Sequence, residues 1–301
     1  MTCLYYNSNL NEYSTKRFRR PSKCPPVDNP YVFADFVKDY DAPPFINKIF
    51  KNGKDVILAY FGILANASNM PGYLGGCGSI GDSLLPYPYA YELLTPSLQA
   101  QMPLEEFIHS FQGIGHITLL NLHKAFHPGT TNFNTCYYMF EIESITGPSA
   151  LEQLTTLRTG SYFVYHYGII STTFNAVSGW KISKISSLPE DFLCAPDHGW
   201  IYSATSLVTF VYKDWYELIT QIDQVKHEGN IVYVYASNPK ASYRFDFIRI
   251  TNGYDILLHE NVCIKGTFQK MNLLKPQDQQ LKLSILNPDL NLNFSNFGLQ
   301  K

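Results

Sequence analysis

The fold is decided by an alternating stretch, residues 136–145, which reads CYYMFEIESI. Large side chains recur at every second position, so Phe140 and Ile142 share one face of an extended chain while Glu141 and Glu143 share the other. This period of two is typical of a β-strand. Paired acids opposite apolar residues indicate that the second face of the strand meets solvent.

Three further runs are rich in aromatic and β-branched residues and predict strands at 116–125, 162–174 and 179–187. The short polar connection 175–179 ends in glycine, which predicts an antiparallel hairpin between the last two runs. In the last run Trp180 and Ile182 are in phase but Ile185 is not, so we expect a bulge near Ser183 and Lys184.

Helical periodicity comes before these strands. A broad apolar stripe predicts a core helix over about residues 55–68, a glycine-rich loop follows, and shorter helices are expected at 89–94 and from Pro103 onward. The loop contains the pattern G-x-G-x-x-G at 76–81, but no strand precedes it and prolines follow, so it does not indicate a nucleotide-binding turn.

A second unit follows a turn-rich segment at 194–199. The pattern Asp214-x-x-Glu217 resembles a capping box and predicts a helix that ends at Gly229 and buries a face containing Trp215 and Val225. Strands are expected at 231–236, 243–250, 254–259 and 262–268. Residues 200–275 therefore predict a small α+β domain of a helix and a β-meander, and the polar residues 276–301 predict a C-terminal strap.

The order of these elements resembles the nuclear-transport-factor-2-like (NTF2-like) superfamily, in its bacterial type, over about residues 45–193. The resemblance is carried by YELLTPSL at 91–98, LEEF at 104–107, GWKI at 179–182 and LPEDF at 188–192. It implies an α+β cone, in which helices pack inside a bent antiparallel sheet and leave a conical hollow. The glycine-rich insertion at 70–86 departs from the family pattern.

Composition limits the classes of function. The 301 residues carry 23 Lys and Arg against 25 Asp and Glu, and five basic residues gather between 16 and 23. We expect residues 1–44 to form a basic polar tail and expect no nucleic-acid partner. The longest apolar run, 56–65, is too short to cross a bilayer and no signal peptide is evident, so we expect no transmembrane segment and a cytoplasmic protein.

The predicted hollow would need polar residues to act chemically. Its candidate ligand-binding residues are Asn121, Tyr162, Tyr165, Tyr167 and Asp191, and its weak catalytic candidates are His123, His166 and Tyr165. Six scattered cysteines without a Cys-x-x-Cys pair, and histidines on a predicted strand, favour neither a metal nor a redox centre, and no cofactor is expected.

The sequence thus leaves two functions open. One is a non-catalytic binding or scaffolding protein, which uses the sheet face or the cavity to contact a protein partner, a second copy or a small apolar ligand. The alternative is a small-molecule lyase or isomerase with a histidine general base in the cavity.

Overall fold

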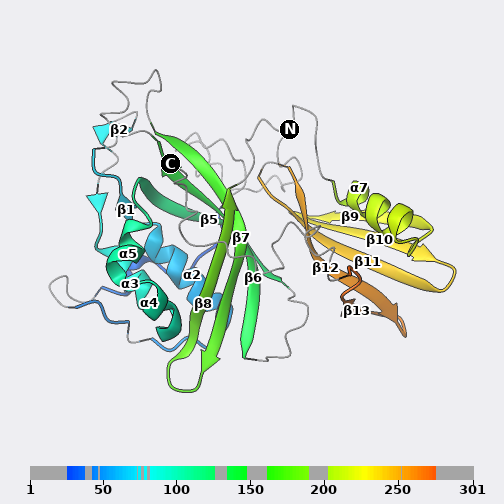
Figure 1. Ribbon diagram of the computed structural model, residues 1–301, viewed down its shortest axis with the longest axis horizontal. Helices are drawn as coiled ribbons and strands as arrows, with labels where there is room; N and C mark the ends of the chain where they lie inside the picture. The colour runs from blue at the N-terminus through cyan, green and yellow to red at the C-terminus, as the bar shows by residue number, and fades with distance from the viewer. Residues whose placement is uncertain are drawn as a thin grey trace. The chain divides into compact units, whose positions relative to one another are not determined.

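The computed structural model describes residues 26–37, 43–46, 48–72, 74–75, 78–79, 82–125, 134–147, 161–189, 203–251 and 253–275. They form a mixed α+β chain of mostly antiparallel strands, which confirms the predicted α+β class (Figure 1). The chain divides into two compact units, one containing α2 to β8 and the other α7 to β13. Each unit is described here by itself.

The helices of the first unit precede its long strands. They are η1 (Phe33–Asp35), α2 (Gly53–Leu64), α3 (Pro86–Tyr91), α4 (Pro96–Gln101) and α5 (Leu104–His109). The Asn52 side chain caps α2 by accepting a hydrogen bond from the backbone N–H of Asp55 at 2.9 Å. The predicted core helix is therefore confirmed, although it ends four residues early because Ser68–Asn69 forms strand β1 and pairs with β5.

A six-stranded sheet curls around α2 in the order β4-β1-β5-β6-β7-β8 (Figure 1). Three long strands follow one another in this sheet: β6 (Thr135–Thr146), β7 (Tyr162–Asn175) and β8 (Gly179–Pro189). Strand β7 pairs antiparallel with β6 on one side and with β8 on the other. The predicted bulge is confirmed, because Ser171 lies opposite Lys184 while Thr172 lies opposite Ile182, which leaves Ser183 as the extra residue. The remaining strands are β1 (Ser68–Asn69), β4 (Asp82–Ser83) and β5 (Ile114–Ala125), with β2 (Leu74–Gly75) and β3 (Gly78–Ser79) in a separate small hairpin.

The space between α2 and the sheet is occupied by the chain's own apolar side chains. Phe61 of α2 and Phe140 of β6 are buried with ring centroids 5.6 Å apart, and Tyr60, Phe107 and Phe111 are also buried in this core. Such packing stabilises the unit by removing large rings from water.

The described part of the predicted N-terminal tail packs on this core. The Asn29 side chain donates to the backbone oxygen of Leu58 in α2 at 2.8 Å, and Phe36 is buried. A Cβ atom at Gly62 would lie 2.2 Å from the Tyr31 carbonyl oxygen, so a glycine is needed where this segment crosses α2. Residues 26–36 are thus a layer on the outer side of the helix.

The second unit packs a short helix on a meander. Its helix consists of α7 (Ala204–Leu207) and the π-helical segment η3 (Val208–Trp215). Its sheet has the order β13-β12-β11-β10-β9 and is antiparallel throughout. The strands are β9 (Gln221–Glu228), β10 (Ile231–Asn238), β11 (Ala241–Arg249), β12 (Asp255–Ile264) and β13 (Thr267–Met271).

Two predictions for this unit were wrong. The helix expected from Asp214 to Gly229 does not form. The true helix ends at Trp215, and Glu217 just after it has a φ of 52°. Residues Gln221–Glu228 form strand β9, because pairing with β10 outweighs a helical pattern of apolar residues. The strands expected at 254–259 and 262–268 have the wrong bounds. A single strand, β12, runs through 255–264, and a turn separates it from β13, which begins at Thr267. The polar residue Glu260 fits inside β12 because it accepts hydrogen bonds from Tyr212 Oη at 2.6 Å and from two backbone N–H groups.

None of the helices in the described part of the chain is long and apolar enough to cross a membrane. Asp191 and the predicted strap at 276–301 lie outside the described residues, as does the basic cluster at 16–23.

Candidate functional site

The residues predicted to line one hollow lie on both faces of the first sheet. His166 lies opposite Ile142, whose side chain belongs to the core around α2. Tyr165 lies opposite Glu143 on the next rung. Consecutive side chains of a strand point to opposite faces, so Tyr165 and His166 do not converge on a common cavity.

The second face of this sheet, opposite the α2 core, carries two buried carboxylates. Glu141 is fully buried and Glu143 is 3% exposed, so the prediction that this face meets solvent was wrong. The Asn121 side-chain amide donates to Glu141 Oε2, and Tyr165 Oη donates to Glu143 Oε2 at 2.5 Å. Hydrogen bonds to ionised groups offset part of the cost of burying them.

The two histidine candidates are poor general bases at neutral pH. Burial lowers the pKa of His166 to about 4. Burial, together with the positive charge of Lys54, lowers the pKa of His123 to about 4. Both rings are therefore neutral near pH 7, where a base of such low pKa has little driving force to take a proton.

Among the remaining ligand-binding candidates, Tyr167 is buried opposite Glu141, whereas Tyr162 begins β7 with half of its side chain exposed. No group of three or more potential metal ligands occurs among the described residues. In the first unit Asn121 and Tyr165 therefore donate hydrogen bonds to buried carboxylates. The residues predicted to line the hollow do not all lie in one site.

The second unit presents an exposed aromatic surface that the sequence did not predict. Phe210 is 67% exposed and Trp215 is 54% exposed, while Val208, Val211 and Tyr212 of the same segment are buried against the sheet. The backbone N–H of Tyr216 bonds to the carbonyl of Val211, five residues back, which is the π-helical spacing. Phe210 and Trp215 are thus two large exposed rings on one helical segment, and they are here called the aromatic ridge.

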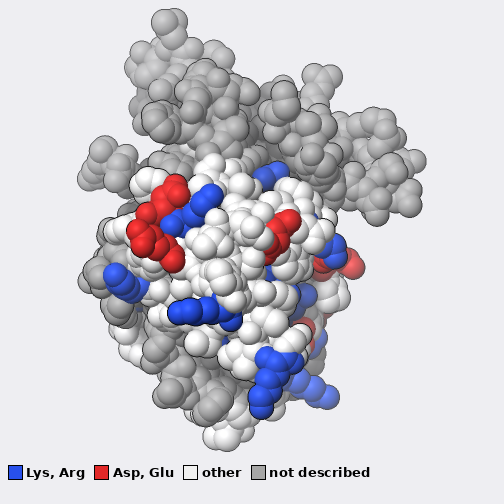
Figure 2. Space-filling model, turned by 90° about the vertical axis from the view of Figure 1, so that its right-hand side faces the viewer, with Lys and Arg blue, Asp and Glu red and all other residues white. Residues whose placement is uncertain are grey.

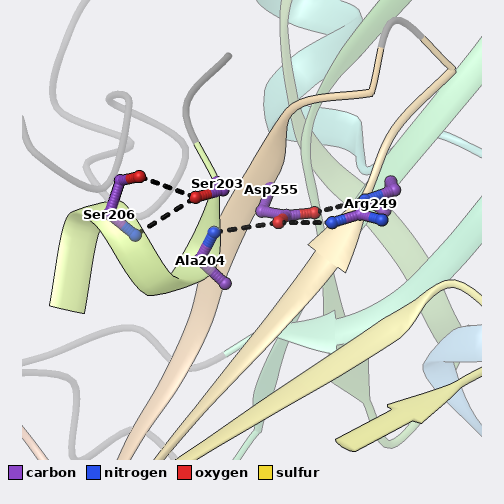
Figure 3. A network of polar contacts seen from close by, with 5 residues as sticks. All are labelled: Ser203, Ala204, Ser206, Arg249 and Asp255. Carbon is purple, nitrogen blue, oxygen red and sulfur yellow. Dashed lines mark hydrogen bonds and ion pairs between the residues drawn. The ribbon is translucent and has the colours of Figure 1, made fainter. Parts of the chain in front are cut away.

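The helix that carries the aromatic ridge is tied to the sheet by a network of polar contacts (Figure 3). Asp255 accepts two hydrogen bonds from Arg249, both at 2.8 Å, and one from the backbone N–H of Ala204, also at 2.8 Å. Ser203 caps the same helix by accepting from the backbone N–H of Ser206 at 3.1 Å. A charge-assisted contact to the first turn of α7 therefore fixes the base of the ridge.

The face of the second sheet opposite its core is polar. Arg244 makes a two-point ion pair with Asp246, at 2.7 and 3.0 Å, and lies over the rings of Tyr233 and Phe268, 5.3 and 5.1 Å from their centroids. Because the guanidinium already covers these two rings, they are not open platforms for stacking a ligand.

Charges of both signs occur on the face of the molecule that Figure 2 draws. On the face drawn in Figure 2, Lys and Arg side chains stand apart from one another, separated by uncharged residues and by Asp and Glu. Such a surface does not attract a polyanion strongly.

Comparison of the chain with family models, curated proteins and solved structures gives no match. The residues and their geometry therefore carry the functional argument.

Proposed function

We propose that this chain is a non-catalytic binding protein that contacts a protein partner through the aromatic ridge. The observation that carries the proposal is the exposure of Phe210 and Trp215 on the outer side of a helix whose inner side is buried. Large aromatic side chains are costly to leave in water, and two of them exposed on one short helical segment are a reason to propose an interaction site there.

The surroundings of the ridge have the composition of a protein interface. Trp is among the residues that contribute most to binding energy in such interfaces. Exposed polar residues surround the two rings on the same helix, including Ser206, Lys213 and Asp214. An apolar centre with a polar rim is the usual arrangement of a protein contact.

Two other kinds of partner are less well supported. A membrane-surface helix is rich in lysine and arginine on its polar face, but η3 carries one basic residue, Lys213. A nucleic acid requires a continuous basic surface, and the charges in Figure 2 are mixed.

The first unit is proposed to be an NTF2-like domain that serves as a scaffold. Support comes from the antiparallel sheet that curls around α2 and from the order of helices before strands. The lyase or isomerase alternative gains no support from the described residues, since Tyr165 and His166 lie on different faces and both candidate histidines are weak bases.

The test places a photo-reactive amino acid at position 210 of the full-length chain, in cells that produce it naturally. We expect one discrete cross-linked protein, which is then identified by mass spectrometry and bound to the purified chain. Trp215→Ala should weaken that binding by about 2 kcal/mol, roughly 30-fold in Kd.

The matched control position is Val177, which is 86% exposed in the turn between β7 and β8. A cross-linker at 177 should not capture the same protein. Equal capture at both positions, or binding that Trp215→Ala leaves unchanged, would contradict the proposal.

A further inference from the structure

A lysine and a histidine meet on the polar face of the second sheet. Lys270 Nζ of β13 lies 2.7 Å from His259 Nε2 of β12. His259 is buried, whereas Lys270 is an exposed residue of β13, the edge strand of the sheet, and its amine end is partly buried against the ring.

The contact fixes the roles of the two nitrogens. A lysine ammonium has three N–H donors and no acceptor, so His259 Nε2 must accept and carries no proton while Lys270 is charged. The imidazole is thereby held with its free electron pair toward the amine. It can take the proton that Lys270 must lose before it acts as a nucleophile.

Charged groups of both signs lie near this pair: Lys124 and Arg244 are positive and Asp246 is negative. His259 lies opposite Asp246 across β11 and β12, and Asp246 is bound by Arg244 in the two-point ion pair. Asn261, which lies opposite Lys270, is uncharged. Burial, followed by the positive charge of Lys124, lowers the pKa of Lys270 and so favours the neutral amine, while the negative charge of Asp246 opposes this shift.

We propose that Lys270 is a site of acylation by small activated acyl compounds, with His259 as the positioned proton acceptor. In this reaction one proton passes from the Lys270 ammonium to His259 Nε2, and the neutral amine nitrogen attacks the carbonyl carbon of a thioester. The new C–N bond forms as the C–S bond breaks, and the departing thiolate takes the second proton that the nitrogen loses. His259 releases the first proton to water, so the products are an amide, a free thiol and a proton.

The acylation site is independent of the aromatic ridge, since the residues involved belong to β11–β13 and not to η3.

The test uses the full-length chain and a small thioester, S-acetyl-N-acetylcysteamine, in limiting amount at about pH 7.5, below the ordinary lysine pKa. Acetylation of each lysine is followed with time by peptide mass spectrometry. The reference lysines are Lys240 and Lys265, which are exposed in turns of the same unit.

We expect Lys270 to be acetylated severalfold faster than Lys240 and Lys265. Its advantage should shrink as the pH rises toward about 10, where all lysines become increasingly neutral. The variant His259→Gln should lower the Lys270 rate toward the reference rates while leaving the rates at Lys240 and Lys265 unchanged.

Two results would overturn the proposal. One is a Lys270 rate in the unaltered chain at or below the reference rates, a comparison that does not depend on any variant folding. The other is a folded His259→Gln chain, verified by circular dichroism, in which Lys270 keeps its full advantage.

Discussion

The His166 ring makes stability depend on pH. Burial lowers its pKa from 6.5 to about 4 in the folded chain, whereas the same ring in the unfolded chain titrates in water near the ordinary value. Between these values the unfolded state binds more protons than the folded state. The free energy of unfolding therefore falls as the pH drops through this window, and the contribution is fully present only above it.

Replacing His166 by glutamine should remove the part of this dependence that comes from His166, while the part that comes from His123 remains. As the pH drops from about 6.5 to about 4, the free energy of unfolding of the unaltered chain should fall by on the order of 3 kcal/mol more than that of the His166→Gln variant. Urea unfolding at a series of pH values measures the difference. The control is His109→Gln, at an exposed ring, which should leave the pH dependence unchanged. Parallel curves for the unaltered chain and His166→Gln would contradict the assignment.

Residue by residue, the sequence predicted which side chains alternate but not what covers each face. Glu141 and Glu143 have the same spacing whether the second face of β6 meets water or protein. Their burial depends on partners distant in sequence, such as Asn121 and Tyr165. The opposite directions of Tyr165 and His166, by contrast, already follow from the predicted strand at 162–174, because consecutive side chains of a strand point to opposite faces.

At the scale of elements, helix α7 depends on one buried carboxylate. Asp255→Asn removes a charge that binds both Arg249 and the backbone N–H of Ala204 (Figure 3). Breaking a fully buried ion pair costs about 3–5 kcal/mol, and the cost here should be lower because the Arg249 side chain is 27% exposed and water can solvate its charge. We expect faster hydrogen exchange throughout α7 and η3, measured by mass spectrometry, with β6 and β7 unaffected.

Ser203→Ala is the matched control for Asp255→Asn. It removes the two hydrogen bonds between Ser203 Oγ and Ser206, one to the backbone N–H and one to the hydroxyl, and should cost about 1 kcal/mol. If the two substitutions change exchange in α7 equally, the Asp255 contact does not anchor the helix.

Elements whose sequence fits only one kind of secondary structure could be predicted. Elements whose sequence fits both a helix and another structure could not. The strands β6, β7 and β8 lie within two residues of their expected bounds, since each is a long run rich in aromatic and β-branched residues. In the sequence, the apolar residues around Trp215 recur at helical spacing. In the structure Trp215 ends η3 as an exposed residue, because the π-helical spacing of five matches neither the helical nor the strand pattern.

At the scale of the whole molecule, the two units have separate cores. The cluster around Phe140 and Phe61 shares no residue with the cluster around Phe245 and Tyr212 among the described side chains. The order of helices and strands was largely predictable because each core is built from segments close in sequence. The packing of residues 26–36 on α2 was not, since it depends on a backbone approach at Gly62 that leaves no periodic signal.

Separate cores predict separate unfolding. Phe245→Leu should destabilise β9–β13 by about 1–2 kcal/mol and leave the exchange of β5–β8 unchanged, while Phe140→Leu should do the reverse. Hydrogen exchange as a function of urea concentration resolves the two sets of amides in the same sample, so each unit serves as the internal control for the other. If either substitution moves both sets by the same free energy, the units unfold as one, and the aromatic ridge could not respond to a partner without the first sheet responding as well.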